Sequence, residues 1–132
     1  MVSKTPCIVD ASAIAAVLFD EPEAAPVMAS VGGNPLLAPG LLRYEMASVC
    51  ATKLRNDPRH AKLTLQRYRL FSGLDIEFAE PDWDTLPIFA RQWDLSAYDA
   101  AYLQLALKRK APLVTLDARV AGAYDRATAR KP

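Results

Sequence analysis

Short apolar runs alternate with longer helical patterns along this chain, and that alternation constrains the fold more than any other feature. The clearest unit is Leu95–Asp117, which reads as a helix, a turn and a strand over residues 113–116 that is closed by Asp117. Apolar runs predict three further strands, at residues 6–9, 36–38 and 76–79. Helical patterns lie between and after them, at residues 13–19, 23–31, 41–55, 59–71, 82–93 and 118–128. This order predicts a parallel sheet with helices on both faces.

The predicted fold class is therefore α/β, a three-layer domain with a small parallel sheet of four strands flanked by helices. We expect one domain over residues 1–132, a length that buries roughly two thirds of the surface of the unfolded chain. A fifth strand at the C-terminal end stays open as an alternative. The final segment, residues 127–132, has no apolar run that would form it.

Composition excludes several classes of protein. The formal net charge is +1, so any contact with nucleic acid has to come from local basic patches. Cys7 and Cys50 fall in a predicted strand and a predicted helix, which is typical of buried thiols in a reducing compartment. No apolar run approaches the roughly 18 residues of a membrane span, and the N-terminus has no signal-peptide pattern. We expect a cytoplasmic protein with no membrane partner.

Four carboxylates stand out by their positions. Asp10 and Asp117 each follow a predicted strand, at the edge where open α/β sheets bind ligands. Glu45 and Asp99 lie on apolar helix faces, where an unpaired carboxylate is costly. Structural roles are also available, because Asp10 and Asp117 fit helix N-caps and Asp99 fits a capping box that starts at Ser96. Four such positions are hard to explain as unrelated residues, so we predict that the four carboxylates share one site.

A site with four carboxylates favours a hard divalent cation. The four charges would repel one another strongly if all were ionised, and a cation relieves that repulsion. Oxygen ligands without a paired His or Cys suit Mg²⁺, or Mn²⁺ as a substitute, rather than zinc. Such a site suits the hydrolysis of phosphodiesters, because a metal activates water and offsets charge on the phosphate.

Four segments, taken in order, also carry a family resemblance. They are Ile8–Ser12, Tyr44–Ala47, Leu95–Ala106 and Leu113–Asp117. Together they resemble PIN-domain proteins, and within these the VapC ribonuclease toxins of bacterial toxin–antitoxin pairs. The resemblance implies a metal-binding cluster of Asp10, Glu45, Asp99 and Asp117, with Ser12 and Thr115 as supporting hydroxyls. It further implies a Mg²⁺-dependent endoribonuclease acting on RNA, a homodimer, and a small VapB-type antitoxin that places a peptide segment in or beside the acidic groove.

Three other functions remain as alternatives. A receiver-type phosphoacceptor domain also gathers acids at strand ends, but no acceptor Asp and no later Lys follow residues 76–79 in the required way. A phosphatase of the haloacid dehalogenase type is disfavoured, because Ser12 stands where that chemistry needs a second Asp after Asp10. A catalytically inactive PIN-like module that binds RNA or protein stays open.

The remaining conspicuous residues are assigned to the surface or the core. Six basic residues between positions 53 and 69 predict a solvated face on a helical hairpin, with phosphate contacts to RNA as the functional alternative. His60 has no second histidine to act with and is expected at the surface, as are the acids at 20, 21 and 23. The aromatic residues Trp83, Trp93, Tyr98 and Tyr102 are predicted to pack in or near the core, with stacking on an exposed base as the alternative for the two tryptophans.

Overall fold

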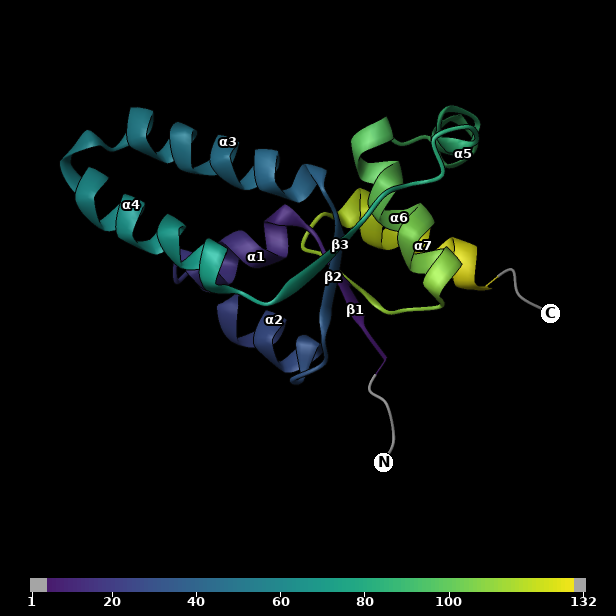
Figure 1. The fold of residues 1–132 in the computed structure, drawn as a ribbon, viewed down its shortest axis with the longest axis horizontal. Helices are drawn as coiled ribbons and strands as arrows, with labels where there is room; N and C mark the ends of the chain where they lie inside the picture. The colour runs from purple at the N-terminus through teal and green to yellow at the C-terminus, as the bar shows by residue number, and fades with distance from the viewer. Residues whose placement is uncertain (1–4, 130–132) are drawn as a thin grey trace.

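The fold is seen in a computed structural model that describes residues 5–129. A parallel sheet of four strands lies between two layers of helices (Figure 1). The strands are β1 (Cys7–Val9), β2 (Leu36–Pro39), β3 (Ile76–Ala79) and β4 (Leu113–Val114), in the order β3-β2-β1-β4. All three strand pairings are parallel, so the four carboxyl ends lie along one edge of the sheet. The predicted α/β architecture with four parallel strands is confirmed.

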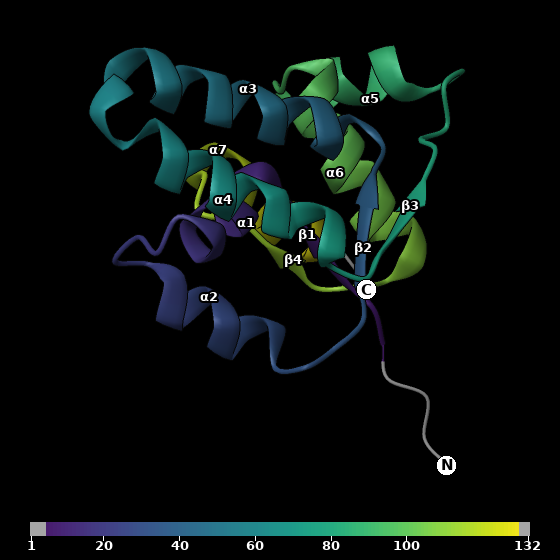
Figure 2. The same cartoon turned by 60° about the vertical axis from the view of Figure 1, so that its left-hand side comes forward.

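Helices cover both faces of this sheet. They are α1 (Ala11–Leu18), α2 (Ala24–Val31), α3 (Leu41–Asn56), α4 (Ala61–Arg69), α5 (Leu86–Trp93), α6 (Ala97–Arg109) and α7 (Ala118–Ala129), with 3₁₀ turns at Pro58–His60 and Leu70–Gly73. Helices α1 to α4 lie on one side and α5 to α7 on the other (Figure 1). Helices α3 and α4 pack side by side as a hairpin that extends away from the sheet (Figure 2). No helix within residues 5–129 has the length and apolar character needed to cross a membrane.

Strand β1 is the centre of the fold. All three of its residues are buried, and it pairs with β2 on one side and β4 on the other. The chain first builds outward from β1 to β2 and β3, then crosses the sheet to add β4. The order of strands therefore reverses between β1 and β4, and such a switch point is where open α/β sheets place their ligands. The two cysteines, Cys7 and Cys50, are buried free thiols as predicted.

Capping residues set the start of the helices that carry the candidate site. Asp10 precedes α1 and accepts a hydrogen bond from the Ala13 amide at 3.1 Å. Ser96 precedes α6, and its hydroxyl accepts a hydrogen bond from the Asp99 amide at 3.1 Å. Both residues act as the caps that the sequence suggested, because a side-chain oxygen at this position satisfies an amide that has no partner within the helix. Helix α1 nevertheless begins at Ala11, two residues before the predicted start at residue 13.

Three predicted elements are longer than those observed. The last strand ends at Val114 rather than at residue 116, because the Leu116 amide donates to the Ser12 hydroxyl at 2.9 Å instead of continuing the sheet. Helix α5 begins at Leu86 rather than at residue 82, and residues 83–85 form a turn before it. Helix α4 begins at Ala61, after a 3₁₀ turn over the predicted first residues.

The fifth strand has no counterpart in the part of the chain that the structure describes. Helix α7 continues to Ala129, and residues 130–132 of the segment considered for that strand lie outside the described residues. Two of the aromatic predictions are also wrong: Trp83 and Tyr98 are 65% and 67% exposed, whereas Trp93 and Tyr102 are buried as expected. Periodicity placed Trp83 in a helix, but it lies in the turn before α5, outside the packed layers.

Candidate active site

Asp10 lies directly after β1 and is the one buried charged side chain among residues 5–129, at 7% exposed. Its carboxylate accepts hydrogen bonds from the Ser12 hydroxyl at 2.7 Å, from the Ala13 amide at 3.1 Å and from the Thr115 hydroxyl. A buried carboxylate needs such donors, because without them the loss of its hydration is costly. Both hydroxyls that were predicted to support the site therefore contact Asp10.

The same two hydroxyls fasten the ends of β1 and β4 together. Besides donating to Asp10, Ser12 accepts a hydrogen bond from the Leu116 amide at 2.9 Å, and Thr115 accepts one from the Asp117 amide at 3.0 Å. The two hydroxyl oxygens are 3.4 Å apart. This network fixes the turn after β4 against the start of α1, and with it the backbone of Asp117.

Asp117 is half-buried at the start of α7. Its Oδ1 atom accepts hydrogen bonds from the Arg119 amide at 2.9 Å and the Val120 amide at 3.3 Å. Asp117 is thus a helix cap, as Asp10 is, and the structural role foreseen for each of them is present. Capping uses only part of a carboxylate, which has two oxygens and about four acceptor positions.

Glu45 approaches the same place from α3. It is half-buried, and its Oε1 atom accepts a hydrogen bond of 2.5 Å from the hydroxyl of Tyr102, a buried residue of α6. Burial raises the pKa of Glu45, and the charges of Asp99 and Asp10 raise it further, while the Tyr102 hydrogen bond acts in the opposite direction. Burial and Glu45 together hold the pKa of Tyr102 far above its usual range, so the tyrosine remains the proton donor.

Asp99 completes the group from the first turn of α6. Burial raises its pKa, and the charges of Asp117 and Asp10 raise it further, against opposing effects from Ser96 and Arg119. Since Glu45 interacts with Asp99 and Asp10, and Asp99 with Asp117 and Asp10, every one of the four predicted carboxylates is electrostatically linked to another. The fold thus brings Asp10, Glu45, Asp99 and Asp117 to one end of the sheet, at the switch point between β1 and β4.

The donor set fits a hard cation in its chemistry but is not arranged as a ready coordination shell. Within residues 5–129, no group of three or more His, Cys, Asp or Glu side chains is placed to hold an ion. In the structure, the Asp10 carboxylate is hydrogen-bonded to Ser12 and Thr115, and the Glu45 carboxylate to Tyr102. Binding of a divalent cation would exchange part of these hydrogen bonds for metal–oxygen bonds and would relieve the repulsion among the carboxylates.

Tyr102 is the site residue that sequence reasoning missed, since it was assigned to the core alone. Its ring is indeed buried, but its hydroxyl reaches Glu45 from the opposite helical layer. The available signal was its spacing, because a residue three positions after Asp99 shares the same helix face.

An open groove of about 560 Å³ begins beside Glu45 and continues along α3 past Ser48, Thr52 and Lys53.

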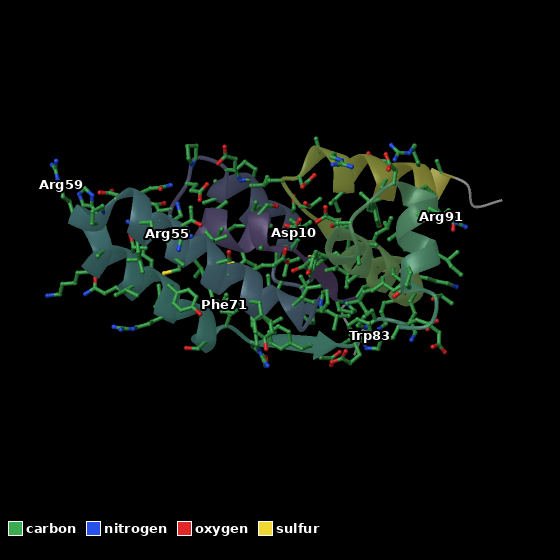
Figure 3. All side chains as sticks on the ribbon, turned by 90° about the horizontal axis from the view of Figure 1, so that it is seen from above. Asp10, Arg55, Arg59, Phe71, Trp83 and Arg91 are labelled. Carbon is green, nitrogen blue, oxygen red and sulfur yellow. The ribbon has the colours of Figure 1, made fainter. Side chains whose placement is uncertain are left out.

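The basic segment divides into residues with internal partners and residues at the surface. Lys53 pairs with Glu21 at 3.6 Å and lies over the Phe19 ring, and Arg67 donates to the Phe19 carbonyl at 3.1 Å. The others are exposed, and Arg55 and Arg59 lie toward the far end of the α3–α4 hairpin from Asp10 (Figure 3). His60 is exposed as predicted and contacts Asp57 at 2.7 Å. Much of the basic segment thus lies away from the carboxylates.

The fold and the site together define a class: a small α/β domain with carboxylates gathered at the switch point of a parallel sheet. Residues 7–126 match the PIN domain family, and the chain belongs to that family. PIN domains are generally nucleases, and they generally use divalent metal ions.

A similarity to a solved structure agrees with this assignment. The crystal structure of PAE2754 from Pyrobaculum aerophilum superposes with a TM-score of 0.65, covering 96% of this chain and 94% of that chain. The two sequences are 21% identical, so the likeness is one of fold. No curated protein matches the sequence.

Proposed function

We propose that this chain is a Mg²⁺-dependent endoribonuclease and the toxin of a type II toxin–antitoxin pair of the VapC kind. The observation that carries the nuclease proposal is the electrostatic linkage of Asp10, Glu45, Asp99 and Asp117 at the switch point. The charges of Asp99 and Asp10 help to raise the pKa of Glu45, and those of Asp117 and Asp10 help to raise the pKa of Asp99. A cation bound among these carboxylates would relieve that repulsion, and hard cations support phosphodiester hydrolysis. The choice of RNA and the toxin role rest on the resemblance of the four sequence segments to VapC proteins.

In this proposal each residue of the site has a defined task. The four carboxylates would hold Mg²⁺, with Mn²⁺ as a substitute, and the bound ion would activate water and offset charge on the phosphate. Ser12 and Thr115 keep the Asp10 carboxylate oriented, and Tyr102 does the same for Glu45. Attack by water forms one oxygen–phosphorus bond while the bond to the 3′ oxygen breaks. The products then carry 5′-phosphate and 3′-hydroxyl ends.

Metal-dependent cleavage of RNA is the test of this function. Purified protein should cut total RNA at discrete positions in Mg²⁺ or Mn²⁺ and should leave it intact in EDTA, with the chemistry of the new ends mapped by ligation and phosphatase treatment. Cleavage that persists in EDTA would contradict the proposal. A 2′,3′-cyclic phosphate would also contradict it, because such an end arises from attack by the ribose hydroxyl rather than by water.

The toxin proposal adds two partners and a compartment: a second copy of the chain, a small VapB-type antitoxin, and the cytoplasm. Expression of this chain in bacteria should arrest growth, and co-expression of the short open reading frame directly upstream of its gene should relieve the arrest. In solution, light scattering should report about twice the chain mass of 14.5 kDa. An arrest that the Asp99→Asn variant reproduces, or one that the upstream product leaves unchanged, would count against the toxin role.

A specific observation also favours a second candidate, a PIN-like binding module without catalysis. The carboxylates of Asp10 and Glu45 are turned toward internal donors, and no ready metal shell exists within residues 5–129. For such a module, RNA would remain uncut under every metal condition, and Mg²⁺ would leave the melting temperature unchanged.

A further inference from the structure

A pocket of about 450 Å³ lies beside the candidate site and has no role in the hydrolysis described above. It opens at the carboxyl ends of β2 and β3, between the starts of α3 and α6 and the turn that precedes α5. Its volume falls within the range of roughly 300–1,000 Å³ that is usual for small-molecule sites. Leu41 and Leu86 are among the aliphatic side chains of its lining.

Three aromatic side chains line this pocket and remain largely exposed. Tyr44, Tyr98 and Trp83 are 82%, 67% and 65% accessible to solvent. Trp83 lies just beyond the end of β3 (Figure 3), where its indole N–H donates to Glu80 at 3.0 Å. Large aromatic surfaces are normally buried, and their gathering around one hollow marks a binding site.

The turn that carries Trp83 is tied to the helix that carries Asp99. The Asp82 amide donates to the Gln104 side chain of α6 at 2.9 Å, and the amide group of Gln104 donates to Thr85 at 3.1 Å. These two bonds hold the residues on both sides of Trp83 against α6. The aromatic wall is therefore fixed relative to the carboxylates.

Two helices contribute side chains both to the pocket and to the acidic site. Tyr44 precedes Glu45 on α3, and Tyr98 precedes Asp99 on α6, so the helices that supply two carboxylates also supply pocket walls. Along the sheet edge, the pocket lies at β2 and β3 while Asp10 lies at β1. Two strand spacings correspond to about 10 Å. A strand of nucleic acid with a phosphate at the carboxylates thus has a neighbouring base within reach of the pocket.

We propose that this pocket binds an unpaired nucleobase of the RNA strand, next to the phosphate that is cut. The proposal rests on the proposed function, whose substrate it extends to single-stranded RNA. A base has two apolar faces and a polar edge, which match an aliphatic floor, aromatic walls, and polar groups from Arg43, Glu80 and the tyrosine hydroxyls. The Arg43 guanidinium lies 4.1 Å from the centre of the Phe78 ring and adds a cation for the flanking phosphate.

Binding measured without cleavage tests this pocket independently of catalysis. The probe is a fluorescently labelled single-stranded RNA of twelve nucleotides in mixed sequence, titrated with protein in EDTA and followed by anisotropy. Trp83→Ala should weaken binding at least about fivefold, since loss of one base–aromatic stack costs roughly 1–3 kcal/mol. Trp83→Phe should retain most of the affinity. Ile88→Ala, at a residue of α5 that is 63% exposed and outside the pocket, is the matched control and should bind as the parent does.

An abasic strand of the same length separates base stacking from phosphate contacts. For this strand the parent and Trp83→Ala should bind equally, because there is no base to stack. The proposal is overturned if Trp83→Ala binds the intact strand as well as the parent, if its loss is the same on the abasic strand, or if the parent shows no binding. It is also overturned if Trp83→Ala binds RNA as the parent does but binds the product of the upstream open reading frame more weakly. That result would mean that the pocket accepts a side chain of the protein partner.

The two proposals fail in different ways. If the protein cleaves RNA in a metal-dependent way but Trp83→Ala binds RNA as the parent does, the nuclease proposal stands and the base-pocket proposal is wrong. If RNA binding depends on Trp83 but the protein cuts no RNA, the base-pocket proposal stands and the nuclease proposal is wrong. The melting temperature of Trp83→Ala should equal that of the parent, because the side chain is largely exposed.

Discussion

Asp99→Asn should lower the rate of RNA cleavage by at least about 100-fold while the protein stays folded. Mutation of a residue that only hydrogen-bonds to a metal ligand commonly costs about 10- to 100-fold in activity, and loss of a ligand itself should cost at least as much. Asn keeps the shape of the side chain and removes its charge, so it weakens a cation site without opening a cavity. The Ser96 cap on α6 is retained, because the hydroxyl accepts from the Asp99 backbone amide. Initial rates on a labelled RNA that the parent cuts provide the measurement.

Asp75→Asn is the matched control for Asp99→Asn. Asp75 is exposed and directly precedes β3, so it lies at the amino edge of the sheet, opposite the carboxylates. Its replacement removes the same charge from the protein and should leave cleavage unchanged. An equal loss in both variants would mean that net charge, rather than the acidic site, sets the rate.

Mg²⁺ should also raise the melting temperature of the parent, which gives a readout that needs no RNA. At about 10 mM Mg²⁺, a site with a dissociation constant near 1 mM adds about 1.4 kcal/mol, or roughly 4 °C for a domain of this size. Asp99→Asn should lose this shift. A shift of the same size in the variant would contradict a role for Asp99 in holding the ion.

The sign of the stability change without metal follows from the pKa of Asp99. The fold raises that pKa above its ordinary value of 3.8, so the folded protein disfavours the ionised carboxylate. The parent therefore loses stability as the pH rises from about 3.8 through the raised pKa of Asp99 in the folded state. Asn at position 99 does not ionise, so the variant does not lose this stability. In EDTA at neutral pH, Asp99→Asn should melt at or above the temperature of the parent.

Tyr102→Phe has the second large expected effect, on stability and on the pH dependence of cleavage. The Tyr102 hydroxyl donates a hydrogen bond of 2.5 Å to Glu45. This bond lowers the pKa of the Glu45 carboxyl, whereas burial raises it. Its loss should cost about 1.5 kcal/mol at pH 7.5, or roughly 5 °C in melting temperature. Because the pKa of Glu45 then rises further, the acid limb of the cleavage profile should move to higher pH.

The pH at which the stability is lost separates this role from simple packing. A raised carboxyl pKa destabilises the fold only where that group would otherwise be ionised, so the loss in Tyr102→Phe should be larger at pH 7.5 than at pH 4. Tyr124→Phe is the matched control, since the Tyr124 hydroxyl donates to the Ala111 carbonyl at 3.1 Å rather than to a carboxylate. Its effect should not change with pH in this range. Equal losses at both pH values for Tyr102→Phe would contradict a positioning role.

The sequence predicted most elements because local signals agreed with the tertiary structure. Asp10 and Ser96 mark helix starts, and Gly32, with a φ of 57°, ends α2 where the Gly32-Gly33 pair predicted it. The errors fall where long-range contacts decide the outcome. The Ser12 hydroxyl takes the amide of Leu116 from a position 104 residues away, which ends β4 early. No local pattern carries that information.

The burial of aromatic residues was also predicted only in part from the sequence. Apolar character predicted burial for both Trp83 and Trp93, yet only Trp93 is buried, in a cluster with Leu103 of α6 and Ala123 of α7. Trp83 is held outward in a turn by the indole bond to Glu80. Burial depends on whether another layer covers the side chain, and composition alone does not specify that.

By itself, the sequence determined the class of fold and the four carboxylates worth considering. Strands alternating with helices admit few topologies, and acids on apolar faces or at strand ends are conspicuous because burial of charge is costly. Only the tertiary structure decided how these residues meet: Tyr102 reaching Glu45, Thr115 reaching Asp10, and an aromatic pocket opening beside them. Those contacts join segments that are distant along the chain, and their geometry follows from how helices pack on a sheet rather than from any local pattern.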